Sequence, residues 1–121
     1  VVDELLTVIR GNLAGLDENG YWQHINDHHH NANPVVGNAS SFGGDLQANI
    51  RGYIDHVLNN YRPVFQDEQL VFDGTGAICN GIHRDGARQG VRVMLNIGDV
   101  TDEDMFANQI GSIQIVNAYP I

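Results

Sequence analysis

Asp99 is the carboxylic acid best placed for acid–base chemistry. Val91, Val93, Leu95 and Ile97 form an apolar row on one face of a predicted strand, and Asp99 continues that row. Burial at the end of such a row would disfavour the ionised carboxylate and raise its pKa, as suits a general acid. The alternative is that Gly98 ends the strand, so that Asp99 is a solvated turn residue at the head of an acidic loop.

His83 is the second candidate for acid–base chemistry. It alternates in register with Ala77, Cys79 and Gly81, small residues that leave room for a ligand beside the imidazole. On a strand that neighbours the one before Asp99, His83 would be near enough to share a substrate with Asp99. The alternative is a histidine that faces water at the end of a hairpin.

Aromatic and apolar side chains would supply the walls of the pocket around these two residues. We expect this lining to consist of Tyr21, Trp22, Asn33, Tyr53, Val57, Cys79 and Leu95. Aromatic residues at helical spacing, such as Tyr53, pack in a core more often than they contact a ligand. Cys79 is the only cysteine, which excludes an internal disulfide, and we interpret it as a small core residue on a strand.

A cluster of histidines over residues 24–30 raises the question of a metal site. His24 and His28 are about one helical turn apart and could chelate together. A zinc site needs three or four ligands, and without further cysteines the others would have to be Asp27 or a remote residue such as His56. We interpret the cluster as a polar helix end and predict no metal.

The charge of the chain excludes several functions. Its 121 residues carry 15 acidic and 6 basic side chains, a formal net charge of -9, and every basic residue is an arginine. Arginines scattered among more numerous carboxylates do not form a phosphate-binding surface, so we expect no nucleic-acid partner. Without lysine the chain can form neither a Schiff base nor a P-loop, and we predict no cofactor.

The length and the apolar pattern indicate one domain that is not embedded in a membrane. A chain of 121 residues can bury a single core. No run approaches the ~18 apolar residues of a membrane helix, and no signal-peptide pattern is visible. We therefore expect no membrane partner and a cytoplasmic location.

Three helices are predicted in the first half of the chain. The longest runs from Gly43 to Pro63, with Asp45 as a good N-cap and Pro63 as a block to continuation. A first helix over residues 1–14 and a short second helix after Asp17 precede it. Gly52, in the middle of the long helix, indicates either a close backbone approach or a tolerated defect, and we favour the first.

Four strands are predicted after Pro63, where the apolar period changes from helical to alternating. They cover Val64–Phe72, Gly76–His83, Ala87–Val100 and Ile110–Tyr119. Asp73-Gly74 and Asp85-Gly86 are typical of tight hairpins, so the first three strands should be antiparallel neighbours. Helices followed by a meander of strands form an α+β pattern, with the helices on one face of a curved antiparallel sheet.

This order of elements, with three short motifs, resembles the NTF2-like superfamily and its SnoaL-like and ketosteroid-isomerase-like members. The motifs are Asn33-Pro34-Val35, Gly43-Gly44-Asp45 and Gln109-Ile110-Gly111-Ser112-Ile113. The resemblance covers nearly the whole chain and implies a single domain, 1–121. In it, three N-terminal helices would pack on a strongly curved, mostly antiparallel sheet, a cone that encloses a pocket. The alternative is an unrelated α+β sandwich.

The resemblance to ketosteroid isomerases is partial at the positions that carry their chemistry. The position of their carboxylate base falls on Asn33, which cannot take a proton, and Ile9 stands in place of their tyrosine. Asp99 falls near the position of their protonated sheet acid. Steroid isomerisation by that mechanism is therefore not expected.

Two functions fit this sequence. The first is an NTF2-like protein that binds a small apolar molecule and isomerises, cyclises or dehydrates it with acid–base side chains, which His83 and Asp99 favour. The second is a non-catalytic dimeric ligand-binding or interaction module, which Asn33 favours. In both cases we expect a homodimer that forms through the sheet. The helices would cover one face of the sheet, and the second copy would cover the other face, which carries Met94 and Val116.

Overall fold

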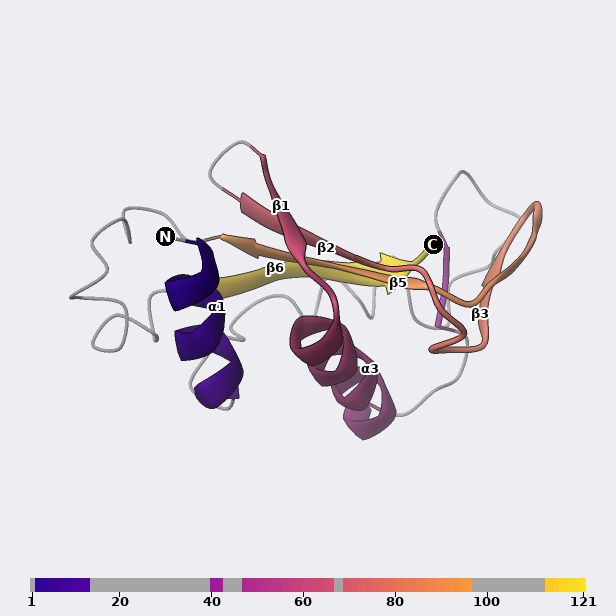
Figure 1. The fold of residues 1–121 in the computed structure, drawn as a ribbon. Coiled ribbons are helices and arrows are strands. Elements are labelled where there is room, and N and C mark those ends of the chain that lie inside the picture. Colours follow the sequence, from indigo (N-terminus) through magenta and orange to yellow (C-terminus); the bar gives the residue numbers. More distant parts are fainter. Residues whose placement is uncertain (1, 14–39, 43–46, 67–68, 97–112) are drawn as a thin grey trace.

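A computed structural model of the chain describes residues 2–13, 40–42, 47–66, 69–96 and 113–121 (Figure 1). The two helices in these ranges are α1 (Val2–Gly11) and α3 (Gln47–Asn60). The strands are β1 (Pro63–Gln66), β2 (Gln69–Gly74), β3 (Gly81–His83), β4 (Gly86–Arg88), β5 (Val91–Asn96) and β6 (Gln114–Pro120). Neither described helix is long and apolar enough to cross a membrane.

The larger sheet has four strands in the order β1-β2-β5-β6, and each pairs with its neighbour in antiparallel orientation. Both described helices lie on one face of this sheet (Figure 1). Alternation along β5 explains this arrangement, since Val91, Val93 and Leu95 are fully buried while the residues between them are half-buried. The predicted division of this strand into an apolar and a mixed face is confirmed.

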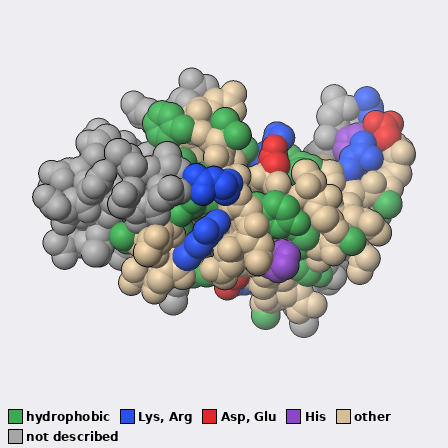
Figure 2. Space-filling model, in the orientation of Figure 1, with side chains coloured by type: hydrophobic (Ala, Val, Ile, Leu, Met, Phe, Trp, Pro, Cys, Tyr) green, Lys and Arg blue, Asp and Glu red, His purple; other side chains and the backbone are tan. Residues whose placement is uncertain are grey.

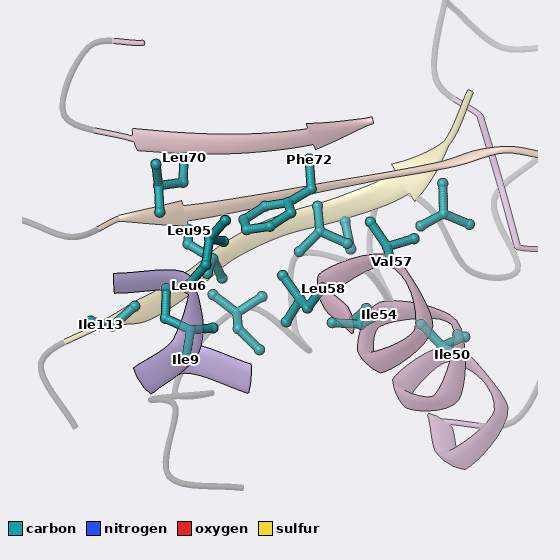
Figure 3. Close-up of a cluster of buried hydrophobic side chains, with 14 of the residues drawn as sticks. Leu6, Ile9, Ile50, Ile54, Val57, Leu58, Leu70, Phe72, Leu95 and Ile113 are labelled. Atoms are coloured by element: carbon teal, nitrogen blue, oxygen red, sulfur yellow. The ribbon is translucent and has the colours of Figure 1, made fainter. Parts of the chain in front are cut away.

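The core lies between the sheet and the two helices (Figure 3). Two cross-strand rows supply its sheet side, namely Phe72–Val93–Ala118 and Leu70–Leu95–Ile115. The helices supply Leu5, Leu6 and Ile9 from α1, and Ile50, Ile54, Val57 and Leu58 from α3. The α3 residues recur at helical spacing, so the predicted apolar face of the long helix is confirmed where it is described.

Two arginines tie the helices together. Arg10, in the last turn of α1, donates hydrogen bonds from Nε to Leu58 O (2.8 Å) and from Nη2 to Tyr61 O (3.0 Å). Arg51 of α3 donates from Nη2 to Leu13 O (2.7 Å), just beyond α1. Helix ends leave carbonyl groups without intrahelical partners, so each guanidinium bonds the C-terminal region of the other helix.

The second sheet is the hairpin of β3 and β4. A hairpin was predicted at Asp85-Gly86, and the structure has one, but its two-residue turn is Arg84-Asp85 because His83 pairs with Gly86. Gly86 is the first residue of β4, and its φ of 132° is a backbone conformation that favours glycine. Ser41 forms an isolated antiparallel bridge with Ile82, in which Ser41 N lies 2.8 Å from Ile82 O and Ile82 N lies 2.9 Å from Ser41 O. The hairpin therefore lies between β2 and β5 in the chain but outside their sheet.

The expectation of three helices on a strongly curved cone was wrong. The described part has two helices, and its sheet of four strands is neither closed nor strongly curled. The predicted second helix lies outside the described residues. The order of strands differs as well, because β2 pairs with β5 rather than with the strand that follows it.

Asp73-Gly74 is not a turn, because both residues lie in β2 and pair with Arg92 and Val91. The hairpin falls earlier, between β1 and β2, which divide the predicted strand Val64–Phe72. Gly74 is required by packing instead, since a Cβ there would lie 2.6 Å from Ile78 Cδ1 and 2.8 Å from Val57 Cγ2. At Gly52, by contrast, a Cβ would meet no described heavy atom within 4 Å, which favours a tolerated defect.

Candidate functional site

An open depression of about 270 Å³ lies beside α3 and is called the α3 depression below. Tyr53 and His56 of α3 form one wall, and Ala77 and Ile78, between β2 and β3, form the other. Tyr53 was predicted to line a pocket, and it borders this one. The other described members of that list lie in the core, where Val57 and Leu95 are 0% exposed and Cys79 is 5% exposed.

Cys79 has the environment of a structural cysteine. Its thiol donates weak hydrogen bonds to Arg88 O (3.5 Å) and Gly90 O (3.6 Å), and its backbone N–H donates to Gln89 O (3.0 Å). These bonds hold the segment before β3 against the segment before β5. The interpretation of Cys79 as a core residue is confirmed, but its placement on a strand was wrong, because β3 begins only at Gly81.

His83 lies at the end of β3 in a small polar cluster of the hairpin. Its Nδ1 accepts a hydrogen bond from the Asp85 backbone N–H (3.1 Å) and lies 3.5 Å from both Arg88 Nη2 and Asp85 Oδ2. Its side chain is only 10% exposed, so it does not face water freely as the alternative interpretation expected. An Nδ1 that accepts leaves the proton of the neutral ring on Nε2.

The remaining predicted site residues lie outside the described residues: Asp99, Tyr21, Trp22, Asn33, His24 and His28. The expected pairing of Asp99 with His83 therefore stays a prediction. Among the residues that the structure does describe, no three or more His, Cys, Asp or Glu side chains gather where they could hold a metal ion.

The sheet face turned away from α1 and α3, called the open face below, carries a pattern that the sequence alone did not reveal. The register places its side chains in three cross-strand rows, which are Gln66–Gln69–Asn96–Gln114, Val64–Val71–Met94–Asn117 and Asp73–Arg92–Tyr119. The first row is entirely amide and the second is mainly apolar. Alternation in each strand was visible, but the rows depend on the pairing of β2 with β5.

The third row of the open face is a bonded cluster. Arg92 donates from Nε to Asp73 Oδ1 (2.6 Å) and from Nη2 to Asp73 Oδ2 (3.1 Å). Its Nη1 donates to the Tyr119 hydroxyl (3.1 Å), and its guanidinium carbon lies 5.8 Å from the centre of that ring. The hydrogen bond to Asp73 and the weaker one to Tyr119 raise the pKa of Arg92 further above its ordinary value.

Two hydrophobic side chains of β1 are strongly exposed at the margin of the sheet. Val64, in the apolar row of the open face, is 67% exposed, and Phe65 is 58% exposed. Figure 2 shows hydrophobic side chains at the surface along the top of the described part, where β1 and β2 lie in Figure 1. The two side chains point to opposite faces of β1, since Phe65 pairs with the core residue Leu70, so only Val64 belongs to the open face.

No family model matches the sequence, and neither the curated proteins nor the solved structures yield a match. The resemblance to the NTF2-like superfamily gains no support from these comparisons.

Proposed function

We propose that this chain is a non-catalytic interaction module that associates with a second copy of itself through the open face of its sheet. The observation that carries the proposal is the composition of that face. Its apolar row, Val64–Val71–Met94–Asn117, is bordered by a row of amides and by one internally neutralised ion pair. Interfaces have this character, with an apolar centre, few charges and polar groups at the rim.

Electrostatics supports a second copy as the partner. The chain has a net charge of -9, so two copies repel each other over most approaches. In a two-fold dimer a patch meets itself, and like charges would then face each other. On the open face the charged side chains among the described residues are Asp73 and Arg92, which pair with each other. Two copies of this face can therefore pack together without repulsion between unpaired like charges.

The size of the face suggests a weak dimer. With a strand spacing of about 4.8 Å and a rise of about 3.3 Å per residue, four strands of this length span about 20 by 20 Å, or about 400 Å². Standard interfaces bury about 800 Å² per partner. We therefore expect a dissociation constant in the range of about ten to several hundred micromolar.

Acid–base catalysis has less support in the described residues. His83 uses Nδ1 within its own hairpin, and its side chain is largely covered. The described sheet does not form the cone that was expected to enclose a small apolar molecule, so it gives that function no support. The lack of a nucleic-acid partner stays a prediction from the acidic composition, and the cytoplasmic location stays a prediction from the apolar pattern of the sequence.

Sedimentation equilibrium from about 5 to 500 µM tests the proposal. The wild-type mass should rise toward that of a dimer, and more strongly in high salt, because salt screens the repulsion between two acidic chains. Val64→Glu places one new charge from each copy in the interface, so this variant should remain monomeric.

Ile82→Glu is the matched control, since Ile82 is also an exposed hydrophobic residue (40%) but lies on β3, outside the open face. It should dimerise like the wild type. A wild-type protein that stays monomeric at 500 µM in high salt contradicts the proposal, and equal loss in both variants contradicts the assigned face.

A further inference from the structure

The α3 depression has walls that are held in place before any ligand arrives. The Tyr53 ring stacks on Phe42, with centroids 6.1 Å apart and planes 23° apart, and Phe42 itself is 2% exposed. On the opposite wall, Ile78 N–H donates to Gln89 O (2.8 Å). The side chain of Ile78 also packs over Gly74, where a Cβ would lie 2.6 Å from Cδ1. Fixed walls reduce the entropy lost on binding.

The size of the depression fits one ring. An engineered cavity of about 150 Å³ takes up benzene, whereas pockets for larger ligands run from about 300 to 1,000 Å³. At about 270 Å³ the α3 depression has room for one substituted ring, and the rest of any larger ligand would lie outside it, because the depression is open. The Tyr53 ring offers an aromatic surface for offset or edge contact with such a ring.

His56 supplies a directional polar group. The side-chain nitrogen Nδ2 of Asn60 lies 3.4 Å from His56 Nδ1, and it also donates to the His56 backbone carbonyl (2.8 Å). An amide nitrogen only donates, so this contact is a hydrogen bond when Nδ1 carries no proton, which places the proton of a neutral ring on Nε2. The edge of the imidazole packs on Tyr61, with centroids 6.3 Å apart. His56 therefore presents a donor on the side away from Asn60.

We propose that the α3 depression is a binding site for a single neutral aromatic ring that carries a hydrogen-bond acceptor, of the phenol type. The ring would contact Tyr53 and Ile78, and its oxygen would accept from His56 Nε2. An anion is disfavoured by the net charge of -9, and the described lining residues include no carboxylate that could pair with a cation, so a neutral ligand fits best. The site is separate from the open face, so it does not depend on self-association.

The probe is 4-methylphenol, titrated into the ¹⁵N-labelled protein and followed by amide chemical shifts. Saturable shifts at Ile78 and Cys79 with a millimolar dissociation constant are expected, because a ligand of this size in an open site binds weakly. The matched ligand 4-methylcyclohexanol has the hydroxyl group without the aromatic ring and should bind at least fivefold more weakly. Equal binding of the two ligands would overturn the aromatic specificity.

Two variants test the location. Ala77→Leu fills the depression from an exposed position and should weaken binding of 4-methylphenol at least tenfold. His56→Phe keeps a ring but removes the donor, so it should weaken binding about fivefold. His56→Gln retains a donor, so it should bind more tightly than His56→Phe but less tightly than the wild type. Asn59→Ala, an exposed position of the same helix, should bind like the wild type. No saturation by 20 mM, or unchanged binding in Ala77→Leu, would overturn the proposal.

The same ring chemistry occurs in free phenols and in tyrosine side chains of other proteins. A Gly-Gly-Tyr-Gly-Gly peptide with blocked ends distinguishes these sources. Binding at least tenfold tighter than that of 4-methylphenol would assign the site to a tyrosine of a partner, and any binding below that threshold would assign it to a small molecule. Sedimentation of Ala77→Leu should be unchanged, so failure here is distinguishable from failure of the dimer proposal.

Discussion

Arg10→Met should destabilise the protein by about 2.5 kcal/mol. The substitution removes the two hydrogen bonds from Arg10 to Leu58 O and Tyr61 O but keeps an unbranched apolar side chain on α1. A hydrogen bond from a charged donor is worth about 1.5 kcal/mol at the low end, which suits a partly buried site, and two of them give about 3 kcal/mol. Water can reach part of this site and recover some of that loss.

Arg10→Lys should lose about half as much stability. A guanidinium presents several donors in a rigid fork, whereas an ammonium group is a point charge that cannot bond both carbonyls with the same geometry. Arg84→Met is the control for the change in net charge, because Arg84 is exposed on the β3–β4 turn. It should change stability by less than about 0.5 kcal/mol.

Urea unfolding followed by circular dichroism measures these differences. With an m-value of about 1.5 kcal/mol/M, a loss of 2.5 kcal/mol lowers the midpoint by about 1.7 M. The m-value itself should not change, because the surface exposed on unfolding stays the same. If Arg10→Met shifted the midpoint no more than Arg84→Met, or if Arg10→Lys were as stable as the wild type, the arginine contacts would not hold the helices together.

The remaining predictions concern two glycines and one ion pair. Gly52→Ala should stabilise the protein by about 1 kcal/mol in the same urea assay, since its Cβ meets no described atom and alanine is the better helix former. Gly74→Ala should lower the free energy of unfolding by about 1 to 3 kcal/mol, because its Cβ would overlap Ile78 and approach Val91 O at 3.0 Å. Equal effects of the two glycine substitutions would contradict this packing. Arg92→Lys should cost about 1 kcal/mol, because lysine cannot hold Asp73 in two hydrogen bonds. A base whose pKa is raised on folding stabilises the folded state fully at any pH below its unfolded pKa, and this stability is lost only as the pH rises through the folded pKa. Both pKa values of Arg92 lie far above neutrality. Thermal melts of the wild type and Arg92→Lys should therefore differ by a constant amount from about pH 6 to pH 9.

The parts of the fold that depend on local pattern could be predicted from the sequence. Apolar residues at helical spacing identified the buried face of α3, and alternation identified Val91, Val93 and Leu95 as the inner face of β5. These patterns work because one element buries one face whatever its neighbours are. The hairpin next to Asp85-Gly86 was equally local, since the chain reverses within two residues between His83 and Gly86.

The parts that depend on pairing over long distances could not be predicted. Gly74 was interpreted as a turn residue because Asp-Gly is a strong turn signal, but its role is to admit Ile78 and Val57, which no local pattern shows. The contacts of Arg10 with Leu58 and Tyr61 join residues about fifty positions apart. The candidate site follows the same rule, since Tyr53 was a predicted lining residue whereas its partners Ala77 and Ile78 appear only in the folded chain.

The position of the small hairpin has a consequence for how the chain folds. β3 and β4 interrupt the chain between β2 and β5, which are neighbours in the larger sheet. Closing a short loop loses less entropy than closing a long one, so hairpin formation first shortens the loop that separates these two strands. Backbone bonds from Ile78 and Cys79 to Gln89 join the two ends of this loop next to the pair of Gly74 and Val91, so we expect pairing to extend from there toward Gln69 and Asn96. The hairpin should therefore set the folding rate of the sheet, and weakening its turn should slow folding more than it speeds unfolding.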